Sequence, residues 1–175
     1  NLPNALSLAL GSGLVTPMQI ASGYAVFANG GYQIQPYFIE KIIDENNNAT
    51  LFIANPPKAC AACIAQTDGA IALPNPMAKR VITPQNAYLM TNAMQSVIQN
   101  GTGKAAKVLG RKDLAGKTGT TNDKVDAWFS GFNSNIVTTV WVGFDNSKSM
   151  HEYGAQAALP IWIQYMRSAL ANTPE

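Results

Sequence analysis

The sequence is most distinctive at Lys117-Thr118-Gly119-Thr120-Thr121, which combines a cation, three hydroxyl groups and a glycine. Because Gly119 has no Cβ, a ligand can lie against the main chain at that point. Alternation along an extended strand places Thr118 and Thr120 on one face and Lys117 on the other, so the lysine side chain must reach around the strand edge. These donors suit a ligand that carries a carboxylate and an amide or lactam carbonyl.

A Gly-Lys-Thr triplet also occurs in phosphate-binding loops, where four residues separate the two glycines ahead of the lysine. Here five residues lie between Gly110 and Gly116. A phosphate-binding loop also follows an apolar strand and begins a helix, whereas a strand-like apolar run comes soon after Thr121. Spacing and context therefore argue against nucleotide binding, and a solvated turn without a ligand stays as the simpler alternative.

Other short segments accompany this stretch along the chain. They are residues 9–13, Thr16-Pro17, residues 25–31, Gly101-Thr102-Gly103, residues 113–123, residues 126–129, residues 140–145 and residues 158–162. In this order they resemble the C-terminal half of the transpeptidase domain of class A penicillin-binding proteins, whose superfamily contains a Lys-Thr-Gly motif. The resemblance covers nearly all of residues 1–175.

The resemblance implies a fold and an activity. The fold is an α/β domain of the α+β type, in which helices cover both faces of an antiparallel sheet, and it is incomplete in this chain. The activity is DD-transpeptidation, which cross-links peptidoglycan. In it a serine attacks the penultimate D-Ala of a stem peptide and an amine from a neighbouring strand resolves the acyl-enzyme. β-Lactams would occupy the same groove, and no cofactor is implied.

The resemblance also implies roles for individual residues. Lys117 and Thr120 are assigned to catalysis, the latter because its backbone N–H would donate to the oxyanion. Thr118, Gly119 and Thr120 are assigned to substrate binding, with the hydroxyls on the substrate carboxylate. Tyr153 is assigned to an apolar wall of the groove, and an exposed loop tyrosine is the alternative.

Two further motifs of this superfamily do not occur in the chain. A nucleophilic serine with lysine three residues later, and a Ser-x-Asn element, are both absent from the sequence. We therefore expect them in an upstream part of the same protein, which would be a partner of this chain together with stem peptides and β-lactams. The implied location is the periplasmic face of the bacterial inner membrane, with the anchor and any glycosyltransferase domain outside this chain.

Two other functions share the Lys-Thr-Gly element and remain alternatives. A hydrolase, either a carboxypeptidase or a β-lactamase, is not expected to share residues 25–31 and 158–162. A non-catalytic module that binds β-lactam or cell-wall peptide would differ in the residues upstream of Asn1, because a serine at the nucleophile position indicates an enzyme.

Composition limits the remaining classes of function. The chain of 175 residues is long enough for one core, and only 13% of its residues are charged, against about 25% in ordinary soluble domains. Low charge fits a piece that buries surface against another segment. A formal charge of +2 is too small to indicate nucleic-acid binding, and no apolar run reaches the length of about 18 residues that a membrane helix needs.

A Cys-x-x-Cys pair, Cys60 and Cys63, lies in a proline-rich loop. A redox dithiol is expected between a strand and a helix, and a zinc site needs further ligands. The only histidine in the sequence, His151, is far along the chain, and we expect it to be solvated. We interpret the cysteines as a disulfide in an oxidising compartment, with free thiols as the alternative.

Capping signals predict two helices, each running from a Thr-Pro pair to an Asn-Gly pair, over residues 16–29 and 83–100. The apolar residues of the second are Ala87, Met90, Met94, Val97 and Ile98. A third helix is predicted over residues 155–170, with Pro160 tolerable only near its start. Its predicted apolar face is formed by Ile161, Tyr165, Met166 and Ala169.

Strands are predicted in two groups. Residues 37–43 and 50–53 form a hairpin, which a loop containing the cysteines follows up to about residue 76. Residues 114–120, 127–133 and 136–144 form three strands, and the short turn at residues 133–135 makes the last two antiparallel.

Overall fold

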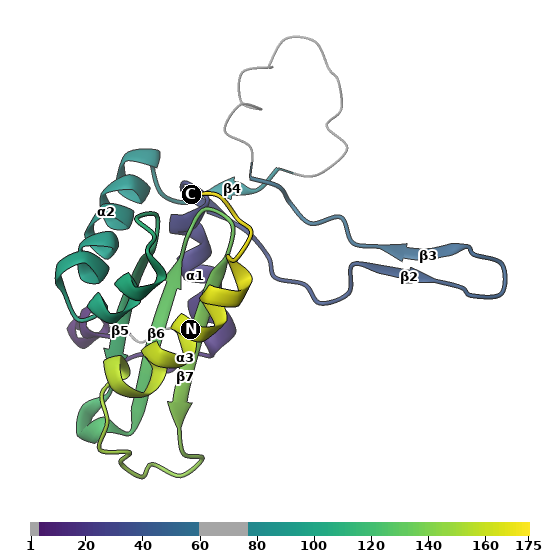
Figure 1. The fold of residues 1–175 in the computed structure, drawn as a ribbon. Coiled ribbons are helices and arrows are strands. Elements are labelled where there is room, and N and C mark those ends of the chain that lie inside the picture. The colour runs from purple at the N-terminus through teal and green to yellow at the C-terminus, as the bar shows by residue number, and fades with distance from the viewer. Residues whose placement is uncertain (1–3, 60–76) are drawn as a thin grey trace.

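The computed structural model describes residues 4–59 and 77–175 (Figure 1). In chain order the elements are η1 (Leu6–Leu10), α1 (Pro17–Ala28), β1 (Tyr32–Gln33), β2 (Lys41–Ile43), β3 (Thr50–Ile53), β4 (Lys79–Arg80), α2 (Pro84–Asn100), η3 (Lys104–Leu109), β5 (Ala115–Thr120), η4 (Asn122–Lys124), β6 (Asp126–Phe132), β7 (Val137–Gly143) and α3 (Gly154–Ala169), where η denotes a 3-10 helix. The cysteines predicted to form a disulfide, Cys60 and Cys63, lie outside the described residues.

A three-stranded antiparallel sheet in the order β5-β6-β7 forms the centre of the molecule. Each pair of strands keeps one register along its whole length. The turn between β6 and β7 is closed by Asn133, whose Oδ1 accepts the backbone N–H groups of Asn135 and Ile136, both at 3.0 Å. All three strands were predicted from the sequence to within one residue at each end.

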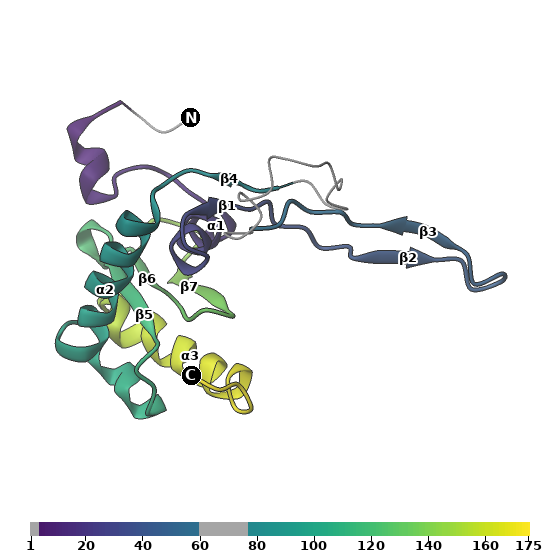
Figure 2. The ribbon, with the colours of Figure 1, turned by 90° about the horizontal axis from the view of Figure 1, so that it is seen from above.

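Helices cover both faces of this sheet (Figures 1 and 2). α3 packs on one face against β6 and β7, and α1 packs on the other face against the same two strands. α2 lies beside β5 and also contacts α1. The arrangement confirms the predicted fold class, an antiparallel sheet between helices.

Two clusters of buried side chains hold the layers together. Phe129 of β6 and Trp162 of α3 meet at the centre of the larger cluster, with their ring centroids 4.9 Å apart and an angle of 62° between the rings. The other buried members on this face are Ile98, Ala106, Leu114, Ala158, Leu159, Ile163, Met166 and Leu170. The α1 face has a smaller cluster, formed by Met94, Ala115 and Phe132 with Tyr24, Phe27, Ala28 and Val137 around them.

The predicted helix starts and stops are confirmed. Thr16 and Gln19 form a reciprocal capping box at the start of α1, because the Thr16 hydroxyl accepts the Gln19 N–H at 3.2 Å and the Gln19 side chain accepts the Thr16 N–H at 2.8 Å. Thr83 caps α2 by accepting the N–H of Asn86 at 3.2 Å. Local hydrogen bonding between neighbouring residues therefore determines where these helices begin.

The predicted apolar face of α3 is wrong for two of its four residues. Ile161 and Tyr165 are 49% and 53% exposed, whereas Met166 is buried. The side of α3 that packs on the sheet is centred on Trp162 and is therefore rotated relative to the predicted face. The Trp162 indole fills the space above Gly131 of β6. Met90 of α2, one of the apolar residues at helical spacing, is 44% exposed, whereas Ala87, Met94 and Ile98 of the same set are buried.

Pro160 lies inside α3 rather than near its start. Proline has no N–H, so the carbonyl four residues earlier, that of Gln156, loses its helical partner. Both residues are on the exposed side of the helix, where water can satisfy that carbonyl. Burial of the opposite side of α3 then keeps the helix continuous through the proline.

The predicted hairpin forms between β2 and β3 and projects from the body of the molecule (Figures 1 and 2). Its first strand begins at Lys41, four residues later than predicted, and the register shifts between Ile42 and Ile43. All residues of both strands are exposed.

A partly buried ion pair lies just before β5 in the chain. Arg111 donates two parallel hydrogen bonds to Asp113, at 2.9 and 2.7 Å, and a third to the carbonyl of Thr173 at 2.7 Å. Asn133 also donates to Asp113 at 3.1 Å. Partial burial acts to raise the pKa of Asp113, but the hydrogen bonds from Arg111 and Asn133 and the arginine charge together hold that pKa below its usual value.

This ion pair predicts an acid-dependent stability. Because the folded-state pKa of Asp113 is lowered, its stabilising contribution is complete above the unfolded carboxyl pKa of about 3.9 and is lost as the pH falls through the folded value. Asp113→Asn should lower the thermal unfolding midpoint at pH 7 and flatten its decline below about pH 4. Asp145→Asn, at an exposed position, is the control, and parallel midpoint-against-pH curves for Asp113→Asn and wild type would contradict the assignment.

Candidate active site

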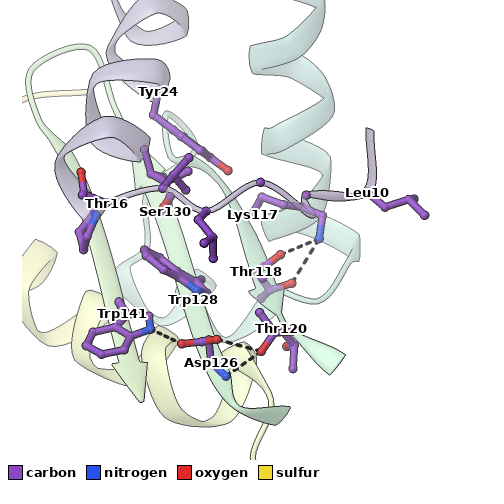
Figure 3. A pocket seen from close by; sticks show the side chains of 18 residues that line it. Leu10, Thr16, Tyr24, Lys117, Thr118, Thr120, Asp126, Trp128, Ser130 and Trp141 are labelled. Atoms are coloured by element: carbon purple, nitrogen blue, oxygen red, sulfur yellow. Dashed lines mark hydrogen bonds between the residues drawn. The ribbon is translucent and has the colours of Figure 1, made fainter. Parts of the chain in front are cut away.

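Lys117 lies on β5, which is an edge strand in the part of the chain that the structure describes. Its register partner is Ser130 of β6, on the face that α1 covers. The ammonium turns back over the strand edge and donates to the carbonyl oxygen of Thr118 at 2.9 Å and to its hydroxyl at 3.4 Å (Figure 3). The lysine side chain therefore reaches around the edge, as strand alternation predicted.

Thr118 and Thr120 have their side chains on the opposite face of β5. The hydroxyl oxygen of Thr118 lies 2.7 Å from that of Thr102, which follows α2. The hydroxyl of Thr120 accepts the backbone N–H of Gly154, the first residue of α3, at 3.1 Å. Because Thr120 acts as an acceptor there, its own O–H proton stays available to a ligand.

The phase of the β5–β6 ladder directs backbone groups of β5 to the free edge. The N–H of Thr121 donates to the carbonyl of Asp126 at 3.1 Å, so these two residues form a hydrogen-bonded pair. Alternation then makes Thr118 and Thr120 members of non-hydrogen-bonded pairs, whose N–H and C=O groups point away from β6. The edge thus presents the Thr120 N–H beside the ammonium of Lys117.

A groove of about 610 Å³ runs along the α1 side of this edge (Figure 3). Its walls are β5 to β7 and the segment from Leu10 through Thr16 into α1. Trp128 and Trp141 form an aromatic floor, with ring centroids 6.2 Å apart. A Cβ added to Gly119 would lie 3.1 Å from the Cβ of Trp128, so glycine keeps this part of the groove open to a ligand.

Asp126 was included in the family resemblance without a role, and the structure places it at the centre of a hydrogen-bond network. Its carboxylate accepts the indole N–H of Trp141 at 2.8 Å and the hydroxyl of Thr121 at 3.1 Å. Its backbone N–H donates to the same hydroxyl at 2.8 Å. The network fixes both ends of the β5–β6 connection and orients one tryptophan of the groove (Figure 3). The feature of the sequence that could have indicated this role is the position of Asp126 directly before Ala127 and Trp128.

Tyr153 lies at the start of α3 and is 53% exposed. It lines a neighbouring hollow of about 530 Å³, which shares Thr120 and Thr121 with the main groove and is also lined by His151. The ammonium of Lys124 lies 4.2 Å from the centroid of the Tyr153 ring. The structure therefore brings Lys117, Thr118, Gly119 and Thr120 together, and it places Tyr153 beyond the far end of the strand.

The close approach of α3 to β5 and β6 requires a glycine at position 154. A Cβ there would collide with the carbonyl oxygens of Gly119 and Trp128 and would lie 3.2 Å from the backbone nitrogen of Trp128. Gly154→Ala should therefore destabilise the protein by about 1–3 kcal/mol, the usual cost of overpacking. Gly23→Ala is the matched control, because an added Cβ meets nothing within 4 Å there. Equal thermal unfolding midpoints for the two variants would contradict this close packing.

Comparison with known proteins identifies the family to which this fold and candidate site belong. The family model described as the penicillin binding protein transpeptidase domain matches residues 3–167. The chain belongs to this family.

Individual relatives agree. The chain is similar to penicillin-binding protein 1A of Pseudomonas aeruginosa, with 45% identity over 99% of this chain and 25% of the relative. The corresponding protein of Neisseria lactamica is 47% identical over 99% of this chain and 20% of its own length. The crystal structure of penicillin-binding protein 1A from Haemophilus influenzae superimposes with a TM-score of 0.88 at 39% identity, covering 99% of this chain and 29% of that one. The chain thus spans about a quarter of the length of these relatives.

Proposed function

We propose that this chain is part of a DD-transpeptidase that cross-links peptidoglycan, and that it works with an upstream segment of the same protein. The observation that carries the proposal is the convergence, at one strand edge, of the Lys117 ammonium, the hydroxyls of Thr118 and Thr120 and an outward backbone N–H. Membership of the transpeptidase family supports it.

The proposed reaction is an acyl transfer in two steps. A serine of the upstream segment attacks the carbonyl carbon of the penultimate D-Ala, and the terminal D-Ala leaves with the proton on its amine. The amine of a neighbouring stem peptide then attacks the acyl-enzyme, and the serine regains its proton. Covalent catalysis divides one difficult transfer into two easier ones.

The residues of β5 are suited to three tasks in this reaction. The Lys117 ammonium places positive charge next to the reacting serine and stabilises negative charge as it develops. The hydroxyls of Thr118 and Thr120 donate to the substrate carboxylate, a charge-assisted contact. The N–H of Thr120 points out of the ladder and provides one donor for the oxyanion. A β-lactam that carries a carboxylate and a lactam carbonyl meets the same groups.

The proposed reaction also determines the cellular location that we propose for this chain. We place the chain at the periplasmic face of the bacterial inner membrane, where stem peptides and β-lactams are its ligands, and where a bifunctional parent would also contain a glycosyltransferase domain. In the described ranges, none of the helices has both the length and the hydropathy of a membrane span.

Lys117→Ala in the complete parent protein should abolish acylation by a chromogenic β-lactam and leave the thermal unfolding midpoint unchanged. Removal of a group that stabilises transition-state charge typically lowers the rate on the order of a hundredfold or more. Stopped-flow absorbance gives the acylation rate. Lys107→Ala, at an exposed position of η3, is the control. A wild-type rate in the Lys117 variant would rule out the proposed role.

The 175-residue chain by itself should not react covalently with penicillin. None of its serines has lysine three residues later, so no serine is placed in the nucleophile motif. Intact mass spectrometry after incubation with penicillin should therefore show the unmodified chain, while the complete parent gains one adduct. A stoichiometric adduct on a serine of this chain would show that the nucleophile had been assigned to the wrong segment.

A further inference from the structure

We propose that Thr102 is a positioning residue of the site, which orients the hydroxyl of Thr118 so that its proton faces the carboxylate of the ligand. The inference rests on the proposed function, because it concerns the carboxylate subsite of that reaction. It starts from the distance of 2.7 Å between the hydroxyl oxygens of Thr102 and Thr118, which come from different elements of the fold.

The Gly-Thr-Gly turn after α2 is built to hold Thr102 at this place. The N–H groups of Gly101 and Gly103 both donate to the carbonyl of Val97, at 3.0 and 3.1 Å, so the chain folds tightly over the end of the helix. A Cβ at Gly101 would lie 2.9 Å from the backbone of Val97. Gly103 is buried, and a Cβ there would lie 3.4 Å from the ring of Phe129. The two glycines let the turn pack on buried side chains while the threonine between them remains exposed at the strand edge.

The number of protons around Thr118 explains what this contact does. A hydroxyl has one proton to donate and two lone pairs that accept. Lys117 can only donate, and its ammonium lies 3.4 Å from the Thr118 oxygen. Without a ligand, the bond between Thr102 and Thr118 can have either oxygen as donor.

A carboxylate ligand removes this ambiguity. An ionised carboxylate has only acceptors, so it favours the state in which Thr102 and Lys117 both donate to Thr118 and the Thr118 proton points to the ligand. Hydrogen bonds in such a chain polarise one another, which strengthens the terminal bond to the anion. Thr102 therefore acts on the ligand through Thr118, and a neutral ligand gains less from it.

The test uses the complete parent protein and two probes, a chromogenic β-lactam with a free carboxylate and its methyl ester. Thr102→Val, which removes the hydroxyl at nearly constant volume, should lower the second-order acylation rate of the carboxylate probe by about tenfold, a common effect of losing one hydrogen bond to a charged group. The rate with the ester should change by less than about twofold. Thr102→Ser keeps the hydroxyl and should therefore retain the wild-type ratio of the acylation rates of the carboxylate probe and the ester. Thr50→Val, at an exposed position of β3, is the matched control.

A double mutant shows whether Thr102 acts through Thr118. If it does, Thr102→Val should add no further loss in a Thr118→Val background, because coupled residues are not additive. Thr102→Ala replaces the valine variant if the latter unfolds.

Several outcomes would overturn the inference. A wild-type rate for Thr102→Val with the carboxylate probe would do so, and equal losses with both probes would show that Thr102 only supports the fold. Absence of β-lactam acylation in the wild-type parent would instead contradict the proposed function itself, so the two failures can be told apart.

Discussion

The pairing of β5 with β6 fixes the side on which each polar group of β5 lies. The bond from the Thr121 N–H to the Asp126 carbonyl sets the phase of the ladder. That phase directs the backbone of Thr118 and Thr120 to the free edge, and it puts their side chains on the face opposite Lys117. A slip by one residue would move each side chain to the other face, so the lysine would enter the core below α3.

Packing on both faces opposes such a slip. On the α3 side, Phe129 and Trp162 pack with ring centroids 4.9 Å apart, and a Cβ at Gly131 would lie 2.7 Å from the Trp162 indole. On the α1 side, the rings of Tyr24 and Phe132 lie edge to face with centroids 6.3 Å apart. Because these contacts depend on which residues face which layer, burial of the two clusters keeps β5 in register.

Features set by near neighbours in sequence could be predicted, and those set by distant contacts could not. The capping box at Thr16, the strand bounds and the side of β5 to which each polar group belongs follow from local spacing. The apolar face of α3 was misjudged because the helix has apolar residues on two sides, and the glycine that accommodates Trp162 is on another element. The contacts of Thr120 with Gly154 and of Thr118 with Thr102 join residues 34 and 16 apart, and no periodicity signals either one.

A site built from an edge strand also has to prevent unwanted strand pairing. The outward N–H and C=O groups that a transpeptidase strand would offer to a peptide are the same groups that another chain could use to extend the sheet. Lys117 covers one of them, because its ammonium bonds to the outward carbonyl of Thr118. Charged side chains over an edge are a common means of blocking such pairing. The position of one lysine thus serves the proposed chemistry and protects the exposed edge, since a strand added here would have to displace a charge-assisted hydrogen bond.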